Sequence, residues 1–85
     1  MADQAEQVSF ARHILPLFRE IDIDHMEPFG VLLNDHEYMA SPQNAQSVRD
    51  FLTGDKEPRM PINGPYWSDE QIALFDRWVK GGYQP

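Results

Sequence analysis

The sequence predicts an all-α fold in one small domain. Apolar residues recur at helical spacing in several segments, no run alternates apolar and polar residues, and prolines and glycines stand between the helical segments. A chain of 85 residues supports one thin core, because about 60% of its surface is buried on folding. We therefore expect a single helical domain over residues 8–85, preceded by a flexible tail over residues 1–7.

The first predicted helix begins near Ser9. Pro16 lies inside this segment and is expected to kink the helix or to mark its first turn after a break. Residues 21–30, which include Pro28 and Gly30, are expected to be a connection that can include one helical turn. The predicted apolar stripe of the helix consists of Phe10, Ile14, Leu17 and Phe18, followed by Ile21.

Two further helices are predicted in the middle of the chain. Asn34 or Asp35 can cap a short helix. Ser41 followed by Pro42 is typical of a helix start, and Gly54 is expected to end that helix. Its predicted inward face consists of Ala45, Val48, Phe51 and Leu52.

A proline-rich loop is predicted over residues 55–67, and the last helix follows it. Ser68 and Gln71 have the spacing of a capping box, and acidic residues in the first turn suit the helix dipole. Gly81 and Gly82 are expected to stop the helix. Its predicted inward stripe consists of Ile72, Phe75, Trp78 and Val79.

Composition excludes several classes of function. The chain has 14 acidic residues against 7 Lys and Arg, a formal charge of −7, which argues against binding to nucleic acid or to an anionic membrane surface. The absence of cysteine excludes disulfides, thiolate nucleophiles, zinc fingers, iron–sulfur clusters and thioether-attached haem. The polar, acidic first residues do not form a secretory signal, and no apolar run is long enough to span a membrane, so we expect a cytoplasmic protein.

The order of the elements resembles that of a class I cytochrome c domain. Such domains open with an amphipathic helix bearing a central proline, as here, and continue with a Cys-x-x-Cys-His motif. The sequence Ile21-Asp22-Ile23-Asp24-His25 stands in that place, with Ile21 and Asp24 at the two cysteine positions and His25 at the position of the proximal ligand. The resemblance extends over residues 8–82. Its later motifs are Arg59-Met60-Pro61, the place of the second axial ligand, and the helix from Ser68 through Trp78 to Gly81.

The resemblance implies a haem-free relative, because no thioether can form without the cysteines, and we expect no cofactor. The alternative is an electron carrier or sensor that binds haem non-covalently through the imidazole of His25 and the thioether of Met60. In the competing interpretation His25 bonds the backbone locally and Met60 fills the core. Bulky side chains would then occupy the space of the macrocycle: Phe29, Phe51, Tyr66, Trp67 and Trp78.

A loose acid–imidazole set is the weak candidate for a metal site. Its members are Asp22, Asp24, His25 and His36, with Asp35 and Glu37 nearby. The spacing does not match a calcium loop, and solvated loop charge is the competing interpretation. A small metal-dependent enzyme is a second alternative function. No catalytic residue is predicted, because no catalytic triad and no phosphate-binding glycine loop is present.

The proline-rich loop is the candidate contact surface for a protein partner. It contains residue types that are enriched at interfaces, namely Arg59, Met60, Tyr66 and Trp67, although Trp67 can instead seal the core beside Trp78. Together with the acidic residues 22–37, this loop predicts a non-catalytic interaction module or small accessory subunit. Its charge favours a partner with a basic face. The oligomeric state stays open.

Overall fold

The computed structural model describes residues 7–57, 59–61 and 64–85, and all regular structure in these ranges is helical, with no strand. The predicted all-α class is therefore confirmed for the described part of the chain. The predicted tail falls almost wholly outside the described residues, since only its last residue, Gln7, is included, and that residue is exposed. Across the described ranges, no helix is long and apolar enough to cross a membrane.

The first helical segment is short and irregular. It consists of a π-helical turn, η1 (Phe10–Ile14), and a 3-10 turn, η2 (Leu15–Leu17). The N–H of Leu15 donates to the carbonyl of Phe10, five residues back, just before Pro16. Because proline has no N–H and its ring crowds the preceding turn, the wide turn and the break after it follow from this residue. The predicted effect of Pro16 is confirmed.

The apolar stripe of the first helix was predicted to reach Ile21, and it does not. The chain becomes extended at Phe18 and Arg19. A second helix, α2 (Glu20–Met26), follows at once and passes into a 3-10 turn, η3 (Glu27–Phe29), which ends at Gly30 with a φ of 78°. The prediction of a connection over residues 21–30 is therefore wrong. Ile21, predicted to extend the inward stripe, is 61% exposed.

The next two helices begin where predicted, and the second also ends where predicted. In α3 (His36–Met39), the side chain of Asp35 accepts hydrogen bonds from the N–H groups of Glu37 and Tyr38. Helix α4 (Pro42–Thr53) begins after Ser41 and ends at Gly54, whose φ of 91° suits glycine. Ser41 occupies the N-cap position, but its side chain makes no capping hydrogen bond.

The last helix, α5 (Asp69–Lys80), has the predicted capping box. The hydroxyl of Ser68 accepts from the N–H of Gln71 at 3.2 Å, and the side-chain oxygen of Gln71 accepts from the N–H of Ser68 at 2.8 Å. Phe75 and Trp78 of the predicted stripe are fully buried. The other two members of the stripe, Ile72 and Val79, are half-buried. The helix therefore turns a narrower face inward than the sequence pattern indicated.

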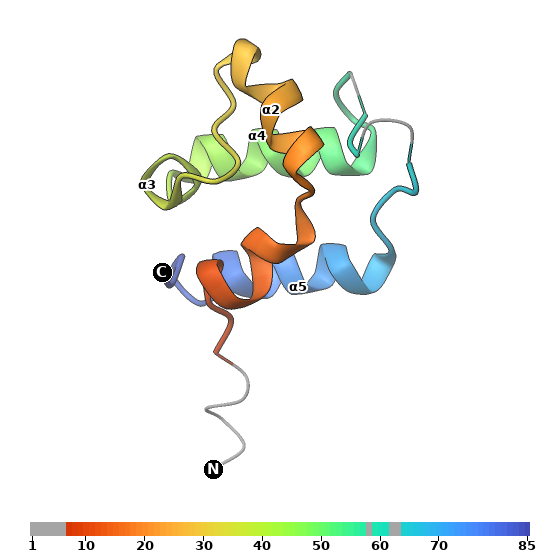
Figure 1. Cartoon of the computed structure of the whole chain (residues 1–85). Helices are drawn as coiled ribbons and strands as arrows, with labels where there is room; N and C mark the ends of the chain where they lie inside the picture. Colours follow the sequence, from red (N-terminus) through yellow and green to blue (C-terminus); the bar gives the residue numbers. More distant parts are fainter. Residues whose placement is uncertain (1–6, 58, 62–63) are drawn as a thin grey trace.

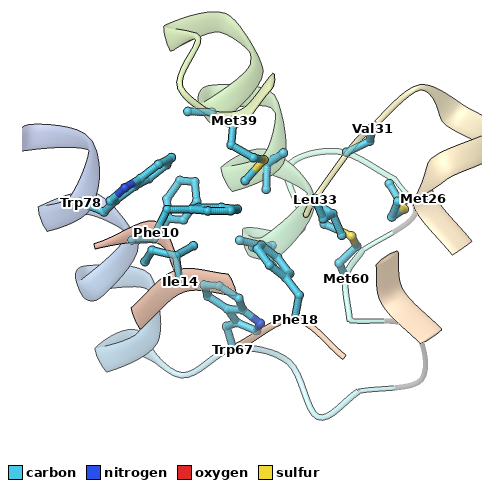
Figure 2. Close-up of a cluster of buried hydrophobic side chains, with 14 of the residues drawn as sticks. Phe10, Ile14, Phe18, Met26, Val31, Leu33, Met39, Met60, Trp67 and Trp78 are labelled. Carbon is cyan, nitrogen blue, oxygen red and sulfur yellow. The ribbon is translucent and has the colours of Figure 1, made fainter. Parts of the chain in front are cut away.

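The helices enclose one apolar core, with α5 packed against both η1 and α4 (Figure 1). The rings of Phe10 and Trp78 lie 5.5 Å apart and join the first turn to the last helix. The ion pair of Arg49 and Asp76 links α4 to α5, with an Nε–Oδ1 distance of 2.7 Å. Figure 2 shows the centre of this core, where buried side chains from every part of the chain meet.

Candidate interaction surface

The structure places the two predicted haem ligands in different surroundings. Met60 is 1% exposed and lies in the core with Met26 and Leu33 (Figure 2). Its N–H donates to the carbonyl of Phe51 at 2.9 Å, which fixes the loop on α4. His25 is exposed on α2. In this packing the pair does not fit a haem, because the thioether is enclosed by apolar side chains while the imidazole lies on the outer face.

The side chains predicted to occupy the space of the macrocycle divide into two groups. Trp67 and Trp78 are buried, at 7% and 0% exposure, and Phe51 is half-buried. Phe29 and Tyr66 are 61% and 48% exposed, so the prediction that these two fill the core is wrong. Residues from other segments occupy the core instead, among them Met26 and Met39.

The acid–imidazole set of the predicted metal site is dispersed. Asp24 and His25 are exposed on α2, whereas Asp22 is turned inward. His36 lies against the ring of Phe10, and its Nε2 is 2.7 Å from the carbonyl oxygen of Tyr83; since a carbonyl only accepts, this nitrogen carries the proton. Among the residues that the structure describes, no three His, Cys, Asp or Glu side chains gather in a way that could hold a metal ion.

Asp22 is the one buried charged residue in the described ranges, at 1% exposure. Its carboxylate accepts two hydrogen bonds from the guanidinium of Arg19, at 2.9 and 3.0 Å, and a third from the backbone N–H of Arg19 at 3.1 Å. The hydrogen bond to this carboxylate raises the pKa of Arg19 above its ordinary value. The carboxylate thus closes the first turn of α2 as well as pairing the charge.

The predicted partner-binding loop presents two of its four named residues to solvent. Arg59 and Tyr66 are exposed, and the guanidinium carbon of Arg59 lies 4.1 Å from the centroid of the Tyr66 ring. Gly54 allows the close approach of Arg59, because a Cβ at Gly54 would lie 3.0 Å from its Cδ. Met60 and Trp67 lie in the core and present no surface to a partner.

A surface on α2 and η3 falls largely within residues 22–37, the acidic region predicted to contact a partner, but its apolar side chains were not predicted to take part. Ile21 and Phe29 are each 61% exposed, and the exposed His25 stands midway between them. Residues four apart share one face of a helix, and the rings of His25 and Phe29 lie 5.9 Å apart. We call these three residues the α2 ridge.

The side chains of the α2 ridge are exposed because the opposite face of α2 is buried. Asp22 and Met26 form the buried face of α2, at 1% and 0% exposure. Because a helix turns by 100° per residue, Ile21 and His25 point away from this face. The usual arrangement of a short helix is thereby reversed, with an aspartate inside and an isoleucine in solvent. Ile21 and Asp22 are adjacent in the sequence, so the sequence alone does not show which of them faces the core. Only the tertiary contacts show that Asp22 is the buried residue.

Acidic side chains share the two elements that carry the α2 ridge. Glu20, Asp24 and Glu27 are exposed on the same two elements. The stretch of residues 20–48 holds 6 of the 14 acidic residues and none of the 7 Lys and Arg residues. The formal charge of this stretch is therefore −6, and three of its carboxylates are exposed on the elements that carry the ridge.

A groove lies between α4 and α5. Its volume is about 330 Å³, and the Arg49–Asp76 pair lies in its wall together with Phe75 and Tyr83. The two charges are bonded to each other, and the described lining contains no histidine, serine or threonine. This groove therefore offers no nucleophile–base pair of the kind that acyl transfer requires.

Comparison of the chain with protein-family models, with curated proteins and with solved structures found no match.

Proposed function

We propose that this chain is a non-catalytic protein-interaction module, or a small accessory subunit, on a haem-free cytochrome-c-like scaffold. The order of its helices, the contact between the first turn and the last helix, and the position of Met60 before α5 support the scaffold. The packing of Met60 in the core supports the haem-free form.

One observation carries the proposed interaction: Ile21 and Phe29 are both exposed on one face of the α2–η3 segment. Single exposed apolar residues are ordinary, but two of them on one short segment, with the ring of His25 5.9 Å from that of Phe29, suit a contact surface. Arg59 stacked on Tyr66 supplies a second exposed group of a type that interfaces favour.

Site-specific photo-crosslinking in the native cells tests this function. A photoreactive phenylalanine analogue replaces Phe29 on the α2 ridge, and a second variant carries it at Ala73, which is exposed on α5, a helix that lies away from α2 (Figure 1). We expect a discrete adduct with one protein from position 29 only, and a complex of fixed stoichiometry when that protein is purified and mixed with the chain. Absence of an adduct at position 29, or equal adducts at both positions, contradicts the proposal.

A further inference from the structure

We propose that the α2 ridge (Ile21, His25 and Phe29) docks on an amphipathic helix whose apolar stripe is flanked by lysine or arginine. This inference rests on the proposed function and names the chemistry of the partner. It is argued from the shape of the ridge, from what holds it outward and from the charges around it.

The shape of the α2 ridge fits a helix. Its side chains follow a spacing of four residues, and such rows insert into the grooves between the side-chain rows of another helix. The ten residues of α2 and η3 extend over about 16 Å, which matches about three turns of a partner helix. An amphipathic helix lying along the ridge would therefore cover Ile21 and Phe29 together.

The α2 ridge is held ready for contact. The carboxylate of Asp22, bonded to Arg19, and the side chain of Met26 fix the rotation of α2, so Ile21 remains outside. Gly30, with a φ of 78°, and the bond from the N–H of Val31 to the carbonyl of Met26 fix the end of the segment. A ridge that is ordered before binding loses little conformational entropy on association.

The charges around the α2 ridge identify which helix fits. Glu20, Asp24 and Glu27 are exposed on the elements that carry the apolar residues, and no Lys or Arg occurs in residues 20–48; Arg19, just before them, is bonded to Asp22. Lysines beside the apolar stripe of a partner would meet these carboxylates and would speed the encounter at low salt. A second copy of this chain would bring a like-charged ridge against the first, which disfavours self-association through this face.

A peptide titration followed by nuclear magnetic resonance tests the inference on the full chain. The probe is a synthetic amphipathic helix of about three turns with a leucine stripe flanked by lysine. Its matched control carries glutamate in place of each lysine. We expect the lysine peptide to shift amide signals of residues 20–31 but not those of Ala73 and the outer face of α5, and the glutamate peptide to shift neither.

Two sets of variants separate the apolar and the charged contributions. Ile21→Ser with Phe29→Ser is expected to weaken binding of the lysine peptide about hundredfold. Glu20→Gln with Asp24→Asn and Glu27→Gln is expected to weaken it about tenfold and to remove most of its salt dependence. Ala73→Ser, on the exposed face of α5, serves as the control and is expected to leave the affinity unchanged. Circular dichroism checks that each variant is folded.

Several results would overturn the inference. Equal affinity of the lysine peptide for the Ile21→Ser, Phe29→Ser variant would show attraction by net charge alone. Equal binding of the two peptides, or of neither, would exclude a basic helix and yet leave crosslinking at position 29 to decide the proposed function. A dimer in sedimentation that the same two substitutions disperse would identify a second copy of the chain as the occupant.

Discussion

The indole of Trp78 lies 5.5 Å from the ring of Phe10, and its Nε1–H donates to the carbonyl of Gln84 at 2.8 Å. The backbone N–H of Phe10 donates to the same carbonyl at 2.9 Å. A single side chain thus connects the first turn, the last helix and the segment that follows it. Since Trp78 is 0% exposed, these contacts lie at the centre of the fold.

Trp78→Ala is expected to lower the free energy of unfolding by about 3–5 kcal/mol, because it leaves a large cavity and removes one of the two hydrogen bonds to the carbonyl of Gln84. For a small domain this is a large fraction of a total of about 5–15 kcal/mol. Urea unfolding followed by circular dichroism measures it. Phe29→Ala is the matched control: its ring is 61% exposed, so the loss is expected to stay within about 0.5 kcal/mol. Equal losses of free energy of unfolding in the two variants would show that Trp78 is not a core residue.

Two of the serines at N-cap positions, Ser41 and Ser68, give a second prediction. Ser68 accepts a hydrogen bond from the N–H of Gln71, whereas the side chain of Ser41 makes no capping bond. Ser68→Ala is therefore expected to lower the free energy of unfolding by about 1 kcal/mol, and Ser41→Ala by clearly less. Thermal unfolding of both variants beside the wild type measures the difference. A larger loss at Ser41 than at Ser68 would contradict the capping assignment.

Helices with conventional start and stop residues were predictable from the sequence. The capping box at Ser68, the proline after Ser41 and the glycine at position 54 each act on the backbone locally. Their effect can therefore be predicted without knowledge of tertiary contacts. Helix α2 was missed because its N-cap residue is Arg19, which is not a usual capping residue. Its start is stabilised by Asp22, three residues later, and that role depends on the paired guanidinium.

The α2 ridge was not predictable for a related reason. A helix of seven residues has too few positions for its apolar periodicity to define an inward face. Ile21, counted as apolar, was assigned to the core, although the buried position belongs to Asp22. The extended residues at Phe18 and Arg19 rotate α2 relative to the preceding turn, so a stripe drawn across them does not persist.

The phenol of Tyr38 gives a prediction at alkaline pH. Burial raises the pKa of Tyr38 above its ordinary value of 10.0, because the folded state disfavours the phenolate. The folded chain therefore holds this proton more tightly than the unfolded chain. Its contribution to stability is complete below about pH 10 and is lost as the pH rises from there through the folded pKa.

Tyr38→Phe is thus expected to show a shallower fall in the free energy of unfolding above about pH 10 than the wild type. Urea unfolding at a series of alkaline pH values measures this slope. The other tyrosines are present in both proteins, so their contribution cancels in the comparison. If the free energies of unfolding of the two proteins fall in parallel with pH, the pKa of Tyr38 is not raised in the folded state.

Addition of haemin tests the alternative redox function. Met60 is enclosed in the core and His25 is exposed, so coordination by both would require the core to open. We expect haemin to produce no Soret band that depends on either side chain. His25→Ala and Met60→Leu are suitable variants, because the first removes an exposed imidazole and the second removes the thioether at nearly constant volume. A band present in the wild type and lost in both variants would establish axial ligation and would oppose the haem-free assignment.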